Sequence, residues 1–406
     1  MEIRPIFASL RKHRIPAILI VLEIALACAV LCNAVFMIGK RVGDIGMSNA
    51  IDESGLSVIS LDGTDPKLAA SDIPRNLAAL RGIAGVQAVG ATSTVPLSGN
   101  NWGWSFGLKS DSLVSDKGNT NLTLYFLGAG ADQALGLQLK QGRFFNADDY
   151  ADSSMGSAAL PVTHVTIVTE SVAAQLWQGK SALGQVLYSK PSYYTVVGVV
   201  ANVLRPYAST RSAQRSYAAT FFPLRAESTL SSYVLRSAPQ DRARIVREAE
   251  QKLGEVNPSA VAKGQTFSDI RDKYFADMRS MAWMLVLVCV VMLAVTAFGI
   301  VGLTSFWVAQ RRRQIGIRRA VGATRGDILS YFRTENFLLT GMGVVIGMVL
   351  AFGINVYLMQ HYEMDRMPWY YLPASAVALW LLGQLAVLGP ALRAAAVPPV
   401  VATRSA

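Results

Sequence analysis

Four long apolar runs constrain this 406-residue chain more than any other feature. Each run holds about 20 mostly apolar residues, which is the length a helix needs to cross a hydrocarbon core of roughly 30 Å. The predicted membrane helices are residues 15–39, 281–308, 336–359 and 372–392. Residues 40–280, between the first two, are numerous enough for a folded domain outside the membrane. The sequence therefore predicts a membrane protein with four transmembrane α-helices and one large extramembrane domain.

Basic residues concentrate at the two ends of the chain and between the second and third runs. These three segments hold 13 Lys and Arg residues against three acids, whereas residues 40–279 hold 24 basic and 21 acidic residues. The positive-inside rule therefore places segments 1–14, 309–335 and 393–406 in the cytoplasm. The large domain and the short loop 360–371 are then expected in the periplasm. The formal net charge of +11 reflects this topology, so no nucleic-acid partner is expected.

The sequence carries no motif for catalysis or metal binding. All three cysteines fall within apolar runs, and the three histidines are scattered without metal-ligand spacing. Neither a Gly-x-x-x-x-Gly-Lys-Ser/Thr phosphate loop nor a Gly-x-Ser-x-Gly nucleophile elbow occurs. We therefore expect no catalytic residue, no metal site and no cofactor on this chain. A catalytic domain without a familiar motif is the alternative class.

Alternating strand and helix patterns run through the large domain. Residues 56–61 and 86–93 read as strands on either side of a capped helix at 72–81, which predicts a β-α-β unit. Further predicted strands are residues 122–127, 164–169, 194–203, 218–224 and 233–235, and further predicted helices are 129–135, 170–177 and 240–253. This alternation indicates an α+β domain. Helical stalks at 40–50 and 268–280 are expected to connect it to the membrane.

The basic segment 309–335 contains a glycine break. Gly322 and Ala323 interrupt a run of helix-forming residues, and Thr324 can cap a following helix with Asp327 at its third position. We predict two short helices that meet at a glycine elbow.

Two features inside the predicted spans are candidate sites. Gly343 and Gly347 form a small-xxx-small pair in the third span, which allows close approach of another helix. Glu23 lies within the first span, where a carboxylate is a functional hypothesis because its burial in lipid is costly. Snorkelling to the near interface and a neutral, hydrogen-bonded acid between helices are the alternatives for Glu23.

Six segments together resemble one known family. In the membrane part these are RQIGIRRAVGATRGDIL (313–329), ENFLLTGMGVVIG (335–347) and PALRAAAVPPVVATR (390–404). In the large domain they are LGLQLKQGRFF (135–145), VTESVAAQLW (168–177) and YTVVGVV (194–200). The chain resembles the permease subunits of MacB/FtsX-type ABC transporters, also called type VII or mechanotransmission systems, with a MacB-like periplasmic core domain. The resemblance covers nearly the whole chain.

The resemblance implies an architecture and a set of partners. The large domain would form a porter-like lobe from residues about 50–98 and 210–267, and a sabre-like lobe from about 99–209. Two permeases, identical or paralogous, would sit on two cytoplasmic ABC ATPases. Because only 14 residues precede the first span, we expect the ATPase, with its ATP and Mg, to be a separate polypeptide.

The resemblance also implies that the cytoplasmic elbow contacts the ATPase. The residues carried over for this role are Ile315, Ile317, Arg318, Arg319, Val321, Gly322, Ala323, Thr324 and Ile328. Ile317, Val321, Ile328 and Phe332 could present apolar contacts, while the arginines meet acidic groups or lipid phosphates. The alternative is that the arginines act only as topological anchors in the membrane.

The function implied is the conversion of ATP-driven motion into movement of a periplasmic domain at the bacterial inner membrane. In the MacB-like version this movement drives efflux of peptides or hydrophobic antibiotics through an adaptor and an outer-membrane duct. An FtsX-like protein that signals to a cell-wall hydrolase and a lipoprotein-releasing permease share the topology. The large domain, with its Gly142-Arg143-Phe144 and Val197-Gly198-Val199 segments, favours the MacB-like version.

Overall fold

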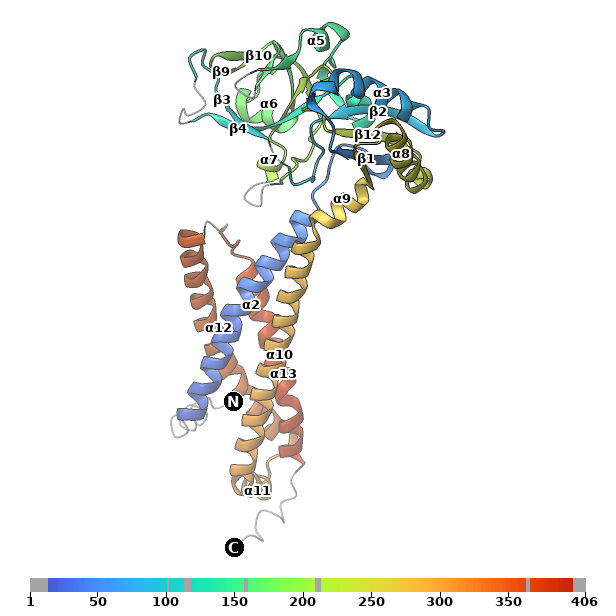
Figure 1. Ribbon diagram of the computed structural model, residues 1–406. Helices are drawn as coiled ribbons and strands as arrows, with labels where there is room; N and C mark the ends of the chain where they lie inside the picture. Colours follow the sequence, from blue (N-terminus) through green and yellow to red (C-terminus); the bar gives the residue numbers. More distant parts are fainter. Residues whose placement is uncertain are drawn as a thin grey trace. The chain divides into compact units, whose positions relative to one another are not determined.

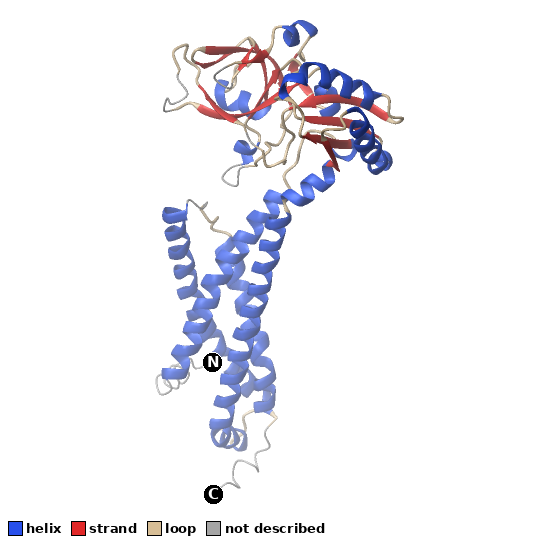
Figure 2. Ribbon diagram, viewed as in Figure 1, coloured by secondary structure: helices blue, strands red, loops and turns tan. Residues whose placement is uncertain are grey.

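The chain divides into a helical unit and a mixed unit. The computed structural model describes residues 14–100, 102–112, 118–156, 160–208, 213–362 and 366–396. The membrane unit comprises residues 1–45 and 278–406, and the ectodomain unit comprises residues 46–277. Figure 2 shows helices in the first unit and both helices and strands in the second. The predicted cytoplasmic terminal segments lie largely outside the described residues.

Among the described residues, four helices are long and apolar enough to cross a membrane, which confirms the predicted spans. They are α2 (Arg14–Ile45), α10 (Ala276–Gln310), α12 (Arg325–Tyr362) and α13 (Tyr371–Ala395), shown in Figure 1. A short helix, α11 (Arg312–Ala320), joins α10 to α12. α2 ends at Ile45, so the stalk predicted over residues 40–50 is helical only in its first half.

Close packing of α12 on α2 occurs where the two predicted glycines lie. A Cβ atom on Gly343 would come within 2.8 Å of the side chain of Ile24, and one on Gly347 within 2.5 Å of the Cβ of Cys28. Real Cβ atoms do not approach so closely, so any larger residue would push the helices apart. The absence of side chains at these two positions therefore determines the spacing of α2 and α12.

Buried amide side chains also connect the membrane helices. Asn33 Nδ2 on α2 donates to the carbonyl oxygen of Ala351 on α12 at 3.2 Å. Asn336 Nδ2 on α12 donates to the carbonyl oxygen of Gly383 on α13 at 2.9 Å. A buried amide without an acceptor would be costly in lipid, so each bond favours one register between its helices.

Four antiparallel strands form the outer strand group of the ectodomain. In spatial order they are β13 (Val261–Thr266), β1 (Leu56–Asp62), β12 (Ser232–Ser237) and β2 (Val86–Thr92). Helices α3 (Ala69–Arg81) and α8 (Arg242–Val256) pack against these strands. Since β1 and β2 each run antiparallel to β12, they are parallel to each other. The predicted β-α-β unit is therefore present, with β12 inserted between its two strands.

Six strands of the inner strand group close into a small barrel (Figure 1). Around the barrel they are β3 (Gly103–Phe106), β4 (Thr120–Leu127), β11 (Ala219–Pro223), β8 (Val165–Thr169), β10 (Ser192–Val200) and β9 (Val186–Ser189). Pairing between Gly107 and Tyr188 brings β3 beside β9 and closes the ring. Other elements between the barrel strands are α4 (Ala131–Leu135), β5 (Leu139–Gly142), α5 (Ala147–Ala151), β6 (Ser154–Met155), β7 (Pro161–Val162), α6 (Glu170–Trp177) and α7 (Ala213–Ser216).

The position of β11 corrects the sequence prediction, which grouped residues 218–224 with the outer lobe. β11 pairs in parallel with β4 and antiparallel with β8, so it belongs to the barrel. All five of its residues are buried, and a strand buried on both faces carries no alternation that would reveal its neighbours. The two strand groups meet where Thr92 of β2 pairs with Leu127 of β4.

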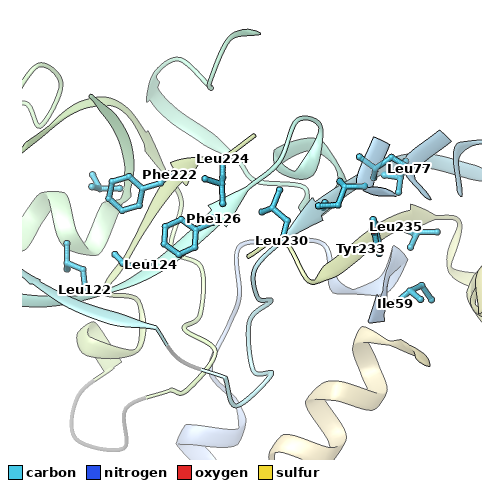
Figure 3. Packing of buried hydrophobic residues seen from close by; sticks show 14 of the residues in the cluster. Ile59, Leu77, Leu122, Leu124, Phe126, Phe222, Leu224, Leu230, Tyr233 and Leu235 are labelled. Carbon is cyan, nitrogen blue, oxygen red and sulfur yellow. The ribbon is translucent and has the colours of Figure 1, made fainter. Parts of the chain in front are cut away.

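One hydrophobic core extends across both strand groups, as Figure 3 shows. It runs from Ile59 of the outer group to Phe126 and Phe222 in the barrel. The ring of Phe222 lies 4.7 Å from that of Tyr194, measured between centroids. Burial raises the pKa of Tyr194 to about 12, so its hydroxyl stays protonated and donates to the carbonyl oxygen of Pro161 at 2.9 Å. The shared core joins the two groups into one folded body.

The two chain ends of the ectodomain unit are held together by an arginine. α9 (Phe267–Tyr274) ends before α10, with a break at Phe275, so the stalk predicted over 268–280 is two helices. Arg271 of α9 pairs with Glu53 at 2.8 Å and donates to the carbonyl oxygen of Met47 at 2.7 Å. The segment that follows α2 and the helix that precedes α10 are therefore directly connected.

Substitution of Gly347 by Ala should destabilise the membrane unit by about 1–3 kcal/mol, because the new methyl group overlaps Cys28 and the overpacked helices must separate. Gly353→Ala is the matched control, since a Cβ on Gly353 meets no atom within 4 Å. Unfolding of each purified variant by titration with a denaturing detergent measures its stability. Equal stability of the two variants would contradict the assigned packing.

Candidate functional site

The elbow, residues 311–327, is a short bend between two membrane helices. A single residue, Arg311, separates α10 from α11, and the α11 helix is nine residues long. Gly322 follows it with φ = 112°, a left-handed conformation that favours glycine. α12 then begins at Arg325. The predicted first short helix and the glycine bend are therefore present.

The predicted helix cap is also present, but the helix it starts is not short. The carboxylate of Asp327 accepts hydrogen bonds from the backbone N–H and hydroxyl of Thr324, at 2.9 and 2.7 Å. The Thr324 hydroxyl oxygen accepts in turn from the backbone N–H of Asp327 at 3.2 Å, which completes a capping box. The prediction of a second short helix was wrong, because α12 continues from this cap through the third span. The elbow thus ends in the first turn of a membrane helix.

A buried ion pair fastens α10 to α12 beside the elbow. Arg311 Nη1 lies 3.1 and 3.2 Å from the two carboxylate oxygens of Glu335. The side chains are only 10% and 2% exposed, and the Arg311 guanidinium also lies 5.7 Å from the centre of the Trp307 ring. The sequence analysis missed this pair. The sequence feature that could have indicated it is an acid just before the third apolar run together with an arginine just after the second.

Two arginines assigned to ATPase contact make contacts within the membrane unit instead of projecting freely. The Arg318 guanidinium lies 5.2 Å from the centre of the Tyr331 ring. Arg319 Nη1 donates at 3.2 Å to the carbonyl oxygen of Ala395, at the end of α13 where carbonyls lack helical partners. These contacts hold the elbow against α12 and α13.

The apolar residues assigned to coupling divide into a buried and an exposed set. Ile315, Ile328 and Phe332 are at most 6% exposed and belong to the core of the membrane unit, so they cannot touch a partner without unfolding. Ile317 and Val321 are 50% and 84% exposed and lie one helical turn apart. We call Ile317 and Val321 the elbow pair.

Exposed basic residues precede and follow the elbow pair in the sequence. Arg312, Arg313 and Arg325 are all exposed on the same short segment. An exposed apolar centre with a cationic margin is suited to bind a protein surface with an apolar pocket and acidic edges. Gly322 and Thr324 are exposed as well, and Ala323 is half-buried.

Glu23 lies between helices and not in a cluster of ionisable groups. It is half-buried, and a Cβ on Gly299 of α10 would come within 2.4 Å of its Oε1 atom. The carboxylate therefore occupies the space that the missing side chain of Gly299 leaves. In the part of the chain that the structure describes, no group of three or more His, Cys, Asp or Glu residues could hold a metal ion.

Family models match both units of the chain. Residues 29–253 match the model of the MacB-like periplasmic core domain, and residues 286–399 match that of the FtsX-like permease C-terminal region. The second match contains the elbow and the Arg311–Glu335 pair.

Curated proteins similar to this chain include two permeases. The macrolide export ATP-binding/permease protein MacB of Chromobacterium violaceum is 26% identical over 244 residues, which are 58% of this chain and 36% of the relative. The uncharacterized ABC transporter permease YknZ of Bacillus subtilis is 24% identical over 245 residues, 58% of this chain and 57% of the relative. The chain thus spans well under two thirds of the length of either protein.

Among solved structures, the periplasmic region of MacB from Actinobacillus actinomycetemcomitans aligns with 54% of this chain and 92% of its own. The identity is 16% and the TM-score is 0.36.

Removal of one charge from the buried pair should cost more than removal of both. Glu335→Gln leaves Arg311 buried without its counter-charge, so we expect a loss of about 3–5 kcal/mol in the free energy of unfolding. The double variant Arg311→Met, Glu335→Leu replaces the pair by apolar groups and should lie within about 1 kcal/mol of the native chain. Unfolding by titration with a denaturing detergent measures the stability of the single variant, the double variant and the native chain. A double variant as unstable as the single one would show that the loss comes from the missing ion pair itself and not from a stranded charge.

Proposed function

We propose, from the premise that this chain belongs to the family of FtsX-like permeases with a MacB-like periplasmic core domain, that it couples an ABC ATPase to its ectodomain. Members of this family work with ABC ATPases, and the chain is a membrane protein with a large extracytoplasmic domain. The ATPase is in this proposal a separate polypeptide that binds ATP and Mg, and the permease contributes no catalytic residue.

The observation that carries the proposal is the exposed elbow pair on a bend that is otherwise firmly held. An 84% exposed valine beside arginines gains from burial against a partner, because apolar surface leaves water. The surrounding arginines would meet acidic groups of the ATPase and set its orientation. The other contacts of the elbow are made within the membrane unit. A partner that moves the elbow pair would therefore also move the helices to which the elbow is attached.

Motion at the elbow can reach the ectodomain through α10, directly along the chain or by way of α12 and an ion pair. α12 starts at the elbow itself, and the Arg311–Glu335 pair connects α12 to α10. α10 is followed backward along the chain by α9, whose Arg271 holds the segment after α2. We infer that rearrangement of the elbow changes the separation of α2 and α10, and that the ectodomain responds through these two connections.

We infer the cellular location from the family and the charge distribution, and the cargo from the family. We infer that the elbow and both termini face the cytoplasm of the bacterial inner membrane, because arginines gather there. Two permease copies, identical or paralogous, would bind two ATPases. The relatives named for macrolide export favour efflux of hydrophobic antibiotics. Peptides are the other cargo that we propose, and a periplasmic adaptor and an outer-membrane duct are the further partners.

Val321→Asp should remove most of the ATPase that co-purifies with the permease in mild detergent. The charge replaces the most exposed apolar side chain of the elbow pair and would be buried without a partner in the interface. Mass spectrometry of the co-purified proteins and vanadate-sensitive ATP hydrolysis measure the loss, which we expect to be at least tenfold.

Val261→Asp is the matched control. Val261 is 59% exposed on β13 in the ectodomain unit, so the same chemical change is made away from the elbow. This variant should retain the ATPase. Full recovery of the ATPase with Val321→Asp, in a stably folded protein, would disprove coupling through the elbow pair. The same mass spectra would reveal an adaptor, a cell-wall hydrolase or a lipoprotein as the periplasmic partner.

A further inference from the structure

A cleft of about 450 Å³ lies between α12 and α13, next to the elbow. Its lining includes Ser330, Arg333, Thr334 and Phe337 from α12, and Trp380 and Gln384 from α13. None of these residues belongs to the elbow pair or to the Arg311–Glu335 pair. The cleft therefore calls for a separate explanation.

One end of the cleft supplies hydrogen-bond donors. Arg333 is exposed there, and the Nε2 atom of Gln384 is buried without a hydrogen-bond partner among the described residues. The hydroxyl of Thr334 donates to the carbonyl oxygen of Ser330 at 2.8 Å, so it is already used. Since that nitrogen atom is buried, a ligand in the cleft would meet the exposed guanidinium of Arg333 and not the amide N–H.

The cleft lacks a negative charge that would satisfy Arg333. No carboxylate is among its lining residues. On the neighbouring turns of α12, the carboxylate of Asp327 accepts hydrogen bonds from Thr324, and that of Glu335 pairs with Arg311. The exposed guanidinium therefore suits an anion with several acceptor oxygens, such as a phosphate.

The other end of the cleft is aromatic. The rings of Phe337 and Trp380 lie 5.2 Å apart in an edge-to-face arrangement, and Phe337 is 48% exposed. Phe337 also begins the apolar run that crosses the membrane, so this wall faces the place where acyl chains start. A free phosphate would leave the aromatic wall unused, whereas a phospholipid would use both ends.

We propose that this cleft binds one anionic phospholipid from the leaflet on the elbow side of the membrane. The Arg333 guanidinium donates to its phosphate oxygens, and an acyl chain lies along Phe337 and Trp380. The lipid then fills the space between α12 and α13 directly behind the elbow. The site depends on neither the ATPase nor the proposed function.

The position of Trp380 in the cleft wall makes the lipid detectable by fluorescence. The full-length protein is placed in nanodiscs that contain either brominated phosphatidylglycerol or brominated phosphatidylcholine in an unlabelled phosphatidylcholine background. Bromine on the acyl chain quenches tryptophan at contact, and the difference between the native chain and Trp380→Phe isolates the Trp380 signal. We expect quenching at several-fold lower mole fraction for phosphatidylglycerol.

Arg333→Gln should reduce the preference for phosphatidylglycerol about fivefold, because one basic residue near an anionic lipid contributes on that order. Arg333→Lys, which keeps the charge, should retain part of the preference. Arg325→Gln is the matched control, since Arg325 is exposed on the first turn of α12 but does not line the cleft.

Three results would overturn the proposal. The first is an unchanged preference in Arg333→Gln, and the second is an equal loss in Arg325→Gln, which would indicate a general surface charge effect. The third is complete competition by millimolar inorganic phosphate, which would identify a free-phosphate site. Thermal unfolding of each variant in the same nanodiscs separates these outcomes from misfolding.

Discussion

The ion pair between Arg311 and Glu335 is the constraint on which the elbow depends. Removal of two charges from water costs several kcal/mol for each ion, and the attraction between them offsets this only when both stay together in good geometry. With side chains 10% and 2% exposed, neither partner can leave without stranding the other. The end of α10 and the start of α12 must therefore remain adjacent, and the bend between them can be short.

The remaining contacts of the elbow extend this constraint to the other membrane helices. Arg319 attaches the bend to the end of α13, and the glycines of α12 bring that helix against α2. Only Ile317 and Val321 are left as exposed apolar groups of the set assigned to coupling. In the proposed function, another protein binds the exposed apolar pair and moves the elbow. Because the other contacts of the elbow are made within the membrane unit, this movement would be passed to α12. A lipid in the cleft behind the elbow would fill the space between α12 and α13 while this occurs.

The parts of the ectodomain unit are also held together, by strand pairing and a shared hydrophobic core. Its two strand groups share the pair Thr92 and Leu127 in the sheet but also one continuous hydrophobic core, in which Phe126 and Phe222 connect the barrel to the outer strands. Close-packed interiors transmit strain because their side chains have little free volume. Arg271 binds the two segments through which the chain enters and leaves this unit. In the proposed function, a change in the separation of α2 and α10 would act on the ectodomain unit through these two segments.

The sequence by itself determined the features that depend on local patterns and on the solvent. Apolar runs of bilayer length required four membrane helices, the capping box at Thr324 required a helix start, and the motifs around residues 313–347 and 135–200 identified the family. Arginine positions indicated a side of the membrane because charge is costly to translocate. Each of these follows from residues near one another in the chain.

Only the tertiary structure decided which distant residues meet. It placed β11 among the barrel strands. The sequence could not show this, because a fully buried strand has no alternation of polar and apolar residues to indicate its neighbours. It buried Ile315, Ile328 and Phe332 while it exposed Ile317 and Val321, because the face of a short helix that is covered depends on how its neighbours pack. It paired Arg311 with Glu335 and left the buried Gln384 amide nitrogen without a partner among the described residues, since both depend on the distance between separate helices. Local sequence sets which groups need partners, and the fold alone sets which partners they find.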